Sequence, residues 1–416
     1  MTESHFPNPH QTLPEPMTAL DPTSWAYETV TRRWPEIANR IFVENELPQS
    51  IEPELKALIS DIPDKSIRLI KDPGAPDIRF WNQYIRVHAG KNWLEPPWFF
   101  TEHYFYRRLI EAIGYFQNGD GEGFDPFVLQ KQQGLEISRG KIRDLVGHVD
   151  IWTHNTDEEE NLMRLFYLDL WGNQADLSMW PAEGDRKPEH QNLDQASQFL
   201  LEDHTEVAVA HILQKNRSDS NREAVRIDFL VDNAGFELVS DLIFSDYLLS
   251  NNFAAFVRLH VKPHPTYVSD AMDKDVLATL DFLKVDSNPE VRDLGLRLVD
   301  CLAQGRLQIR ENFFWTSPLP GWELPPSLEI ELSQSSLVIS KGDANYRRLL
   351  GDLNWPKTTK FADILAYFPV PIVALRTVKA EIACGMQPGQ SEYVAAKDPS
   401  WMTNGRWGMI QFFRPN

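Results

Sequence analysis

Beyond about residue 222, short β-rich runs alternate with amphipathic helical stretches, and this alternation restricts the fold more than any other feature. Strand-like runs are expected at about 224–232, 253–261, 307–315, 336–342 and 371–378. Helical patterns of ten or more residues lie between several of these runs. Strands that alternate with such helices build a parallel sheet with both faces covered. We therefore predict an α/β fold with a Rossmann-like, three-layer α/β/α core over residues 216–416.

The preceding part of the chain, residues 23–215, has a mainly helical pattern. Apolar residues recur there at helical spacing, over residues 24–47, 51–62, 98–113, 158–173 and 193–214. We predict a helical domain over this range. Residues 1–22 are rich in Pro, Thr and His and lack the basic and apolar regions of a signal peptide, so a flexible tail is expected.

The charge balance restricts the kind of ligand. The chain carries 60 acidic against 41 basic residues, a net charge of −19, which argues against a general nucleic-acid binder because such proteins need a basic face. No apolar run approaches the roughly 20 residues needed to cross a bilayer, so no membrane partner is expected. Two cysteines without CxxC spacing favour a reducing, cytoplasmic compartment.

Polar side chains stand where the predicted strands end. The strand that ends FLV is followed by Asp232 and Asn233, and Asp270 follows the next strand. Ligands of open parallel sheets bind at this carboxyl edge. Two carboxylates and an amide oxygen form a hard ligand set that suits Mg²⁺ or Mn²⁺. The alternative is structural, with Asp232 capping the next helix and Asn233 in a turn.

Two further strand ends carry groups suited to an anionic ligand. In SKGDANYRRLLGD, Gly342 allows close backbone approach, and the helix start with Arg347 favours phosphate or polyol oxygens. Lys379 closes the last of these strands and offers a compact positive charge. Each has a structural alternative, a capped helix for the first and a snorkelling lysine for the second. Taken together, the strand ends supply the parts of a phosphoryl-transfer site.

Other motifs are missing or weak. No GxGxxG follows a strand, no Walker A loop occurs, and Ala234 stands where a DxDxT nucleophile motif needs its second Asp. The GxSxG elbow of serine esterases is also absent. His148, Asp150 and His154 fit neither helix nor strand spacing as a metal set.

Four ordered motifs resemble a known family. FLVDNAGFEL, TYVSDAM, KGDANYRRLLGD and LRTVKAEI are similar to those of the metal-dependent damage-control phosphatases, once a domain-of-unknown-function family (number 89) and also named for a proposed acidic-residue methyltransferase. The RTVK form of the RTxK motif resembles the third subfamily, which acts on sugar phosphates. PWFFTEHYFYRRLIEAI and LDLWGNQADLS resemble its helical-domain signatures.

The resemblance assigns roles to individual residues. It implies metal ligands at Asp232, Asn233 and Asp270, with Mn²⁺, Mg²⁺, Co²⁺ or Ni²⁺ as the ion. Asp232, Asn233 and Lys379 are the implied catalytic residues. The implied substrate-binding residues are Glu237, Asp343, Asn345, Tyr346, Arg347 and Lys379.

The expected activity is hydrolysis of a sugar phosphate such as fructose 1-phosphate or fructose 6-phosphate, as metabolite damage control. The expected partner is therefore a small molecule. Two alternatives are a protein carboxyl methyltransferase that uses S-adenosylmethionine, and a sugar-phosphate-binding protein without turnover. The missing glycine loop weighs against the first, and an intact metal-ligand set weighs against the second.

Overall fold

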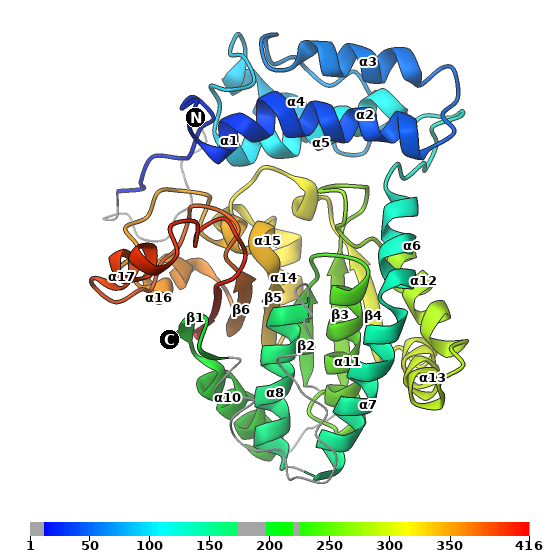
Figure 1. Cartoon of the computed structure of the whole chain (residues 1–416), viewed down its shortest axis with the longest axis vertical. Coiled ribbons are helices and arrows are strands. Elements are labelled where there is room, and N and C mark those ends of the chain that lie inside the picture. The colour runs from blue at the N-terminus through cyan, green and yellow to red at the C-terminus, as the bar shows by residue number, and fades with distance from the viewer. Residues whose placement is uncertain (1–11, 156, 173–196, 219–224, 416) are drawn as a thin grey trace.

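The computed structural model describes residues 12–155, 157–172, 197–218 and 225–415. Within them, a helical cap lies above a larger α/β body (Figure 1). The body is built on a sheet with the strand order β1-β7-β6-β5-β2-β3-β4. Its strands are β1 (Leu200–Asp203), β2 (Arg226–Leu230), β3 (Phe256–Val261), β4 (Leu307–Glu311), β5 (Leu337–Lys341), β6 (Ile372–Thr377) and β7 (Gly408–Phe413). The predicted α/β class is confirmed.

Five neighbouring strands, from β6 to β4, are mutually parallel, so their carboxyl ends share one edge of the sheet. β7 runs antiparallel to β6, and β1 is parallel to β7. All residues of β2, β5 and β6 are buried, because helices cover both faces. Asp228 of β2 is tolerated inside the sheet because Arg226 and His260 bond to its carboxylate.

Alternating side chains divide the body into two hydrophobic cores. Ile339 of β5 and Leu375 of β6 pack in the first core, whereas Val338 and Ala374 pack in the second. The helices of the first core are α7 (Arg139–Asn155), α8 (Glu158–Trp171), α10 (Thr205–Ser218), α11 (Phe236–Ser250), α12 (Asp273–Lys284) and α13 (Pro289–Ala303). The second core lies beneath α14 (Pro326–Leu332), α15 (Gly342–Leu349), α16 (Phe361–Ile364) and α17 (Gln390–Lys397).

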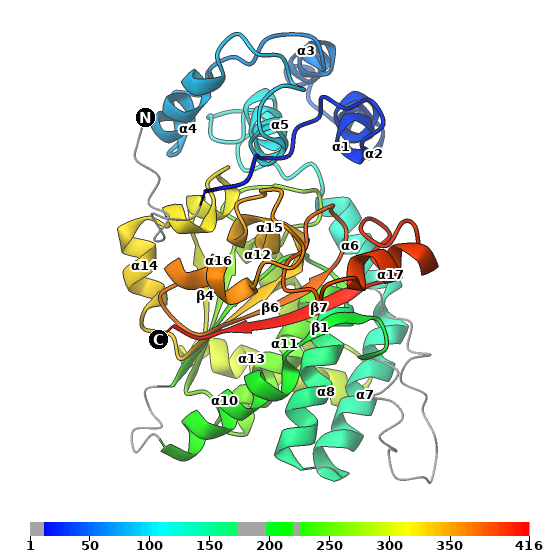
Figure 2. The ribbon, with the colours of Figure 1, turned by 90° about the vertical axis from the view of Figure 1, so that its left-hand side faces the viewer.

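The cap has its own aromatic core. Trp34 stacks on Trp98 and Phe105, with ring centroids 5.4 and 4.9 Å apart. Its helices are α1 (Trp25–Glu28), the π-helical turn η1 (Thr29–Arg33), α2 (Trp34–Glu44), α3 (Glu52–Asp61), α4 (Ile78–Ile85) and α5 (Trp98–Ile113). α6 (Val128–Ile137) then leads down to the body. Figure 2 shows the cap next to α15, at the end of the body where α15 begins.

The predicted domain boundary at residue 215 stays a prediction, but elements before it already belong to the body. α7, α8 and α10 pack in the first core of the sheet. Residues 200–203, inside a predicted helix, form β1 instead and pair with β7, with Leu200 packed against the first core and Leu201 in the second. Residues 193–196 of that predicted helix lie outside the described residues.

The predicted tail is packed where the structure describes it. Ala19 is buried, and the backbone N–H of Ala19 donates to Leu94 O at 3.2 Å. Pro16 forms a β-bridge with Leu353 of the body. Residues 12–22 therefore contact both cap and body, and residues 1–11 lie outside the described part. Among the described helices, none is both long and apolar enough to cross a bilayer.

Candidate active site

The turn after β2 and the loop after β3 lie side by side at the carboxyl edge of the sheet. Asn233 forms a β-bridge with Asp270, and Ala271 N donates to Asp232 O at 2.8 Å. Tyr267 and Val268 in the β3 loop have φ angles of +53° and +61°, which is rare for such residues. This left-handed turn folds the loop back so that Asp270 faces the β2 turn.

Asn233 holds the carboxylates of the β2 turn together. Its Nδ2 donates to Asp232 Oδ2 at 2.8 Å and to Glu237 Oε2 at 2.9 Å. Its Oδ1 accepts the Ser269 hydroxyl at 2.5 Å and keeps a second lone pair for another partner. Glu237 lies in the first turn of α11, four residues after Asn233, and is buried.

Burial and repulsion between neighbouring carboxylates disfavour the ionised forms of Asp232 and Asp270. Burial, followed by repulsion from Glu237 and Asp270, raises the pKa of Asp232 well above its usual value, although Lys262 and Lys379 oppose the shift. Burial also raises the pKa of Asp270 to about 6, against the attraction of Lys262. Asp270 Oδ2 is buried without a hydrogen bond from any described residue, and Lys262 Nζ lies 3.4 Å away.

These features fit a hard divalent cation. A cation would balance the repelling carboxylates and coordinate Asp270 Oδ2, whose described partner is the ion pair with Lys262. Its ligands would be Asp232, Asn233 and Asp270, as predicted. The described residues contain no cluster of three or more His, Cys, Asp or Glu arranged to hold a metal, and this set is instead two carboxylates with an amide.

The start of α15 lies against the same carboxylates. Gly342 has a φ angle of +81°, and a Cβ built on it would overlap the Asp232 carboxylate. Only glycine fits this close approach without displacing Asp232. The next residue, Asp343, accepts a hydrogen bond from Arg376 Nε at 2.7 Å, so the RTVK motif and the α15 start are joined.

Lys379 and Arg347, two further predicted residues, line the same cavity as these carboxylates. Lys379 follows β6, is half-buried, and makes no ion pair with the described residues. Arg347 pairs with Asp352 at 2.7 Å and with Glu102 of the cap at 2.6 Å. Arg347 therefore ties the cap to the body at the cavity wall.

Two predicted substrate residues face elsewhere. Asn345 Nδ2 donates to Lys341 O at 2.9 Å and to Val231 O at 3.3 Å, so it braces the ends of β5 and β2. The Tyr346 hydroxyl donates to Gln411 at 2.7 Å in the second core. Neither Asn345 nor Tyr346 lines the cavity.

A buried lysine beside the site was not predicted. Lys341, the last residue of β5, donates to Asp169 Oδ1 at 2.8 Å and to Asp241 Oδ1 at 2.7 Å. These contacts with the two carboxylates raise the pKa of Lys341 against the effect of burial. Asp169 belongs to the motif LDLWGNQADLS, of which residues 173–178 lie outside the described part. The motif drew attention to the segment around Asp169, but it did not indicate that Asp169 pairs with Lys341.

A cavity of about 550 Å³ lies between the cap and the strand ends, a size within the usual range for small-molecule sites. The predicted residues Asp232, Asn233, Asp270, Glu237, Asp343, Arg347 and Lys379 line it from the body. The cap lines it with residues that include Trp25, Thr29, Arg33 and Tyr106, which sequence reasoning missed.

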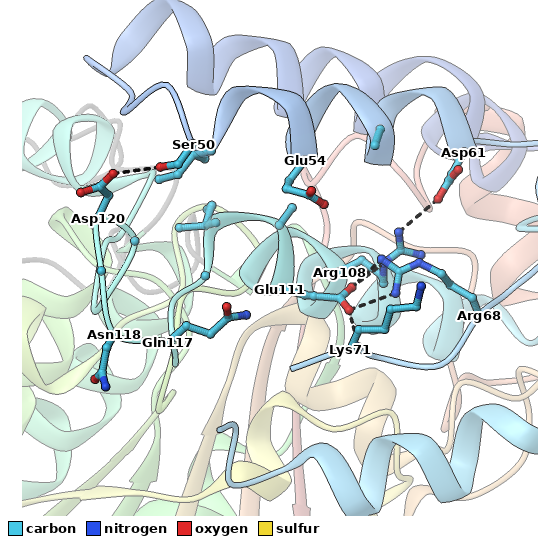
Figure 3. Close-up of a pocket in the computed structure, with 17 residues that line it drawn as sticks. Ser50, Glu54, Asp61, Arg68, Lys71, Arg108, Glu111, Gln117, Asn118 and Asp120 are labelled. Carbon is cyan, nitrogen blue, oxygen red and sulfur yellow. Dashed lines mark hydrogen bonds and ion pairs between the residues drawn. The ribbon is translucent and has the colours of Figure 1, made fainter. Parts of the chain in front are cut away.

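A second cavity, of about 730 Å³, lies between α3 and the end of α5 in the cap (Figure 3). Several of its charged side chains are paired with one another. Arg68 forms two 2.9 Å hydrogen bonds with Glu111, and Arg108 donates to Asp61 at 3.1 Å. None of the predicted site residues lines it. The smaller cavity is therefore the better candidate.

A family model and curated relatives point to one family. The model of the damage-control phosphatase ARMT1-like domain matches residues 29–394. Damage-control phosphatase ARMT1 of Mus musculus is 32% identical, with 96% of this chain and 98% of the relative covered. The Homo sapiens protein of the same name is 30% identical, with 97% and 99% covered. A DUF89-family crystal structure from Pyrococcus horikoshii matches 86% of this chain and 92% of that chain, at 14% identity and a TM-score of 0.44.

Proposed function

Because this chain belongs to the ARMT1-like damage-control phosphatase family, we propose that it is a metal-dependent phosphatase that hydrolyses sugar phosphomonoesters. The observation that carries the proposal is the meeting of Asp232, Asn233 and Asp270 with Lys379 in one cavity. The first three supply hard oxygen ligands, and Lys379 supplies a positive charge that is not paired with a carboxylate of any described residue. Fructose 1-phosphate and fructose 6-phosphate are the substrates we propose first, since the RTVK motif resembles the sugar-phosphate subfamily.

Each residue has a proposed task. Asp232, Asn233 and Asp270 would hold Mn²⁺, Mg²⁺, Co²⁺ or Ni²⁺. When bound, such a cation supplies Lewis-acid polarisation of a phosphoryl oxygen. Lys379 binds the phosphate as a point charge. Asn233 stays oriented through Glu237 and Ser269, so its amide needs little reorganisation when the ligand arrives.

The sugar is held mainly from the α15 side. Asp343 keeps one carboxylate oxygen free of the Arg376 bond, and that oxygen can accept a sugar hydroxyl. Arg347 is fully engaged by Asp352 and Glu102, so its proposed role is to position Glu102 at the wall.

The test is phosphate release from fructose 1-phosphate with and without added Mn²⁺. We expect metal-dependent release, with Asp270→Asn and Asp232→Asn each reducing kcat/KM by about 100-fold or more. Thermal unfolding with and without Mn²⁺ checks that each variant is folded and has lost metal-induced stabilisation. Full activity of Asp232→Asn would sink the proposal. Tight binding of S-adenosylmethionine without phosphate release would favour the carboxyl methyltransferase instead.

A further inference from the structure

The cap wall of the cavity contains a π-helical turn with an unsatisfied hydroxyl. η1 (Thr29–Arg33) interrupts the helix between α1 and α2, and such π-turns often mark functional positions. Thr29 is only 4% exposed and lines the cavity. Its Oγ1 has no hydrogen-bond partner among the described residues. A buried hydroxyl in this state costs stability unless a ligand satisfies it.

The same turn brings an unpaired arginine to the cavity. Arg33 lies with its guanidinium carbon 5.0 Å from the centroid of the Trp25 ring, and both residues line the cavity. In the part of the chain that the structure describes, Arg33 makes no ion pair. Its neighbour Arg32, by contrast, pairs with Glu28 and Glu36.

The charges of the cavity lie on separate walls. The candidate metal-binding carboxylates and Lys379 belong to the body, at the strand ends where the phosphoryl group is proposed to bind, whereas the cap carboxylate Glu102 is already paired with Arg347. Arg33 belongs to the cap. Burial raises the pKa of Tyr106 in α5, and the nearby positive charge of Arg33 opposes this rise. A ligand with one phosphate at the strand ends would leave the guanidinium without a counter-charge.

We propose that Trp25, Thr29 and Arg33 form a cap subsite that binds a second anionic group on the sugar, as in a sugar bisphosphate. Arg33 binds the anion through charge-assisted hydrogen bonds. Thr29 Oγ1 donates to the same group, and the Trp25 ring packs on the carbon skeleton of the sugar. This inference rests on the proposed phosphatase function and extends it to bisphosphorylated substrates.

The test compares two substrates in four proteins. Phosphate release from fructose 1-phosphate and from fructose 1,6-bisphosphate is measured with Mn²⁺ for the wild type, Arg33→Gln, Thr29→Val and Arg32→Gln. We expect Arg33→Gln to lower kcat/KM for the bisphosphate by about 10-fold or more relative to the monophosphate, mainly through KM. Thr29→Val should change the ratio in the same direction by less.

Arg32→Gln is the matched control, since Arg32 lies on the same turn and is exposed like Arg33, but it pairs with Glu28 and does not line the cavity. Its substrate ratio should equal that of the wild type. Equal losses on both substrates in Arg33→Gln, or no change in the ratio, would overturn the subsite. Arg33→Lys should recover part of the bisphosphate preference.

A second measurement separates this proposal from the proposed function. If the wild type releases no phosphate from either sugar, the phosphatase proposal fails. Calorimetric binding of fructose 1,6-bisphosphate then tests the subsite alone. Weaker binding by Arg33→Gln than by Arg32→Gln supports it, and equal binding overturns it.

Discussion

Replacement of Gly342 by alanine tests the packing of α15 against the candidate metal site. The new Cβ would overlap the Asp232 carboxylate, and the backbone would keep a φ angle of +81°. A left-handed conformation costs alanine about 1–2 kcal/mol. Loss of chain entropy in the unfolded state returns about 0.4–1 kcal/mol. The backbone effect alone should therefore lower the free energy of unfolding by about 1 kcal/mol.

The effect on activity should be much larger than the effect on stability. Asp232 must move aside for the methyl group, and a displacement of about 1 Å in a site can cost about 100-fold in rate. We expect Gly342→Ala to lose most Mn²⁺-dependent phosphate release and most of the Mn²⁺-induced stabilisation. Both are measured on protein whose unfolding in urea shows a single cooperative transition.

Gly389 offers a matched control. Its φ angle is +82°, and a Cβ there would have no heavy atom within 4 Å. Gly389→Ala should lose about the same stability while retaining wild-type activity. If Gly342→Ala behaves like Gly389→Ala in metal binding and turnover, the close approach of α15 to Asp232 has no functional importance.

Three further substitutions address other parts of the structure. Lys341→Met should lower the free energy of unfolding in urea by about 3–5 kcal/mol, because it leaves two buried carboxylates without their cation; a loss below about 1 kcal/mol would contradict this. Burial lowers the pKa of His264 from 6.5 to about 4, so the unfolded state takes up a proton first as the pH falls. His264 should therefore contribute a loss of up to about 3 kcal/mol between pH 6.5 and pH 4, and His264→Gln should lose less than the wild type over the same window. Asn345→Ala should reduce kcat more than KM, because Asn345 braces the backbone before Asp232 rather than touching the substrate; an increase confined to KM would instead indicate direct contact.

The candidate metal site was accessible from the sequence because parallel strands impose a common edge. Asp232, Asp270 and Lys379 each follow a strand in the pattern, and the fold brings such positions together whatever their separation along the chain. The family resemblance then gave each residue a role. The left-handed turn at Tyr267 and Val268 was not predictable, because neither residue favours a positive φ angle.

Other parts required the three-dimensional structure. The partners of Lys341 come from α8 and α11, 172 and 100 residues away along the chain. Nothing local distinguishes it from a solvent-facing lysine at a strand end. Asn345, in contrast, was assigned to the substrate although it lies about 200° around α15 from Asp343. This angular separation already indicated that Asn345 faces away from the side of α15 on which Asp343 lines the cavity.

The sequence did not indicate that Arg33 of the cap lines the cavity, because this depends on how the cap docks on the body. An amphipathic pattern shows which side of a helix is buried, but it does not show which exposed arginine faces another body. That choice depends on how α5 sits on α15, which is fixed by the buried contacts of Glu102 with Arg347 and Tyr267. Arg33 reaches the cavity only in this arrangement. A change at Glu102 should therefore alter substrate preference through the position of the cap, although Glu102 itself is already engaged by Arg347.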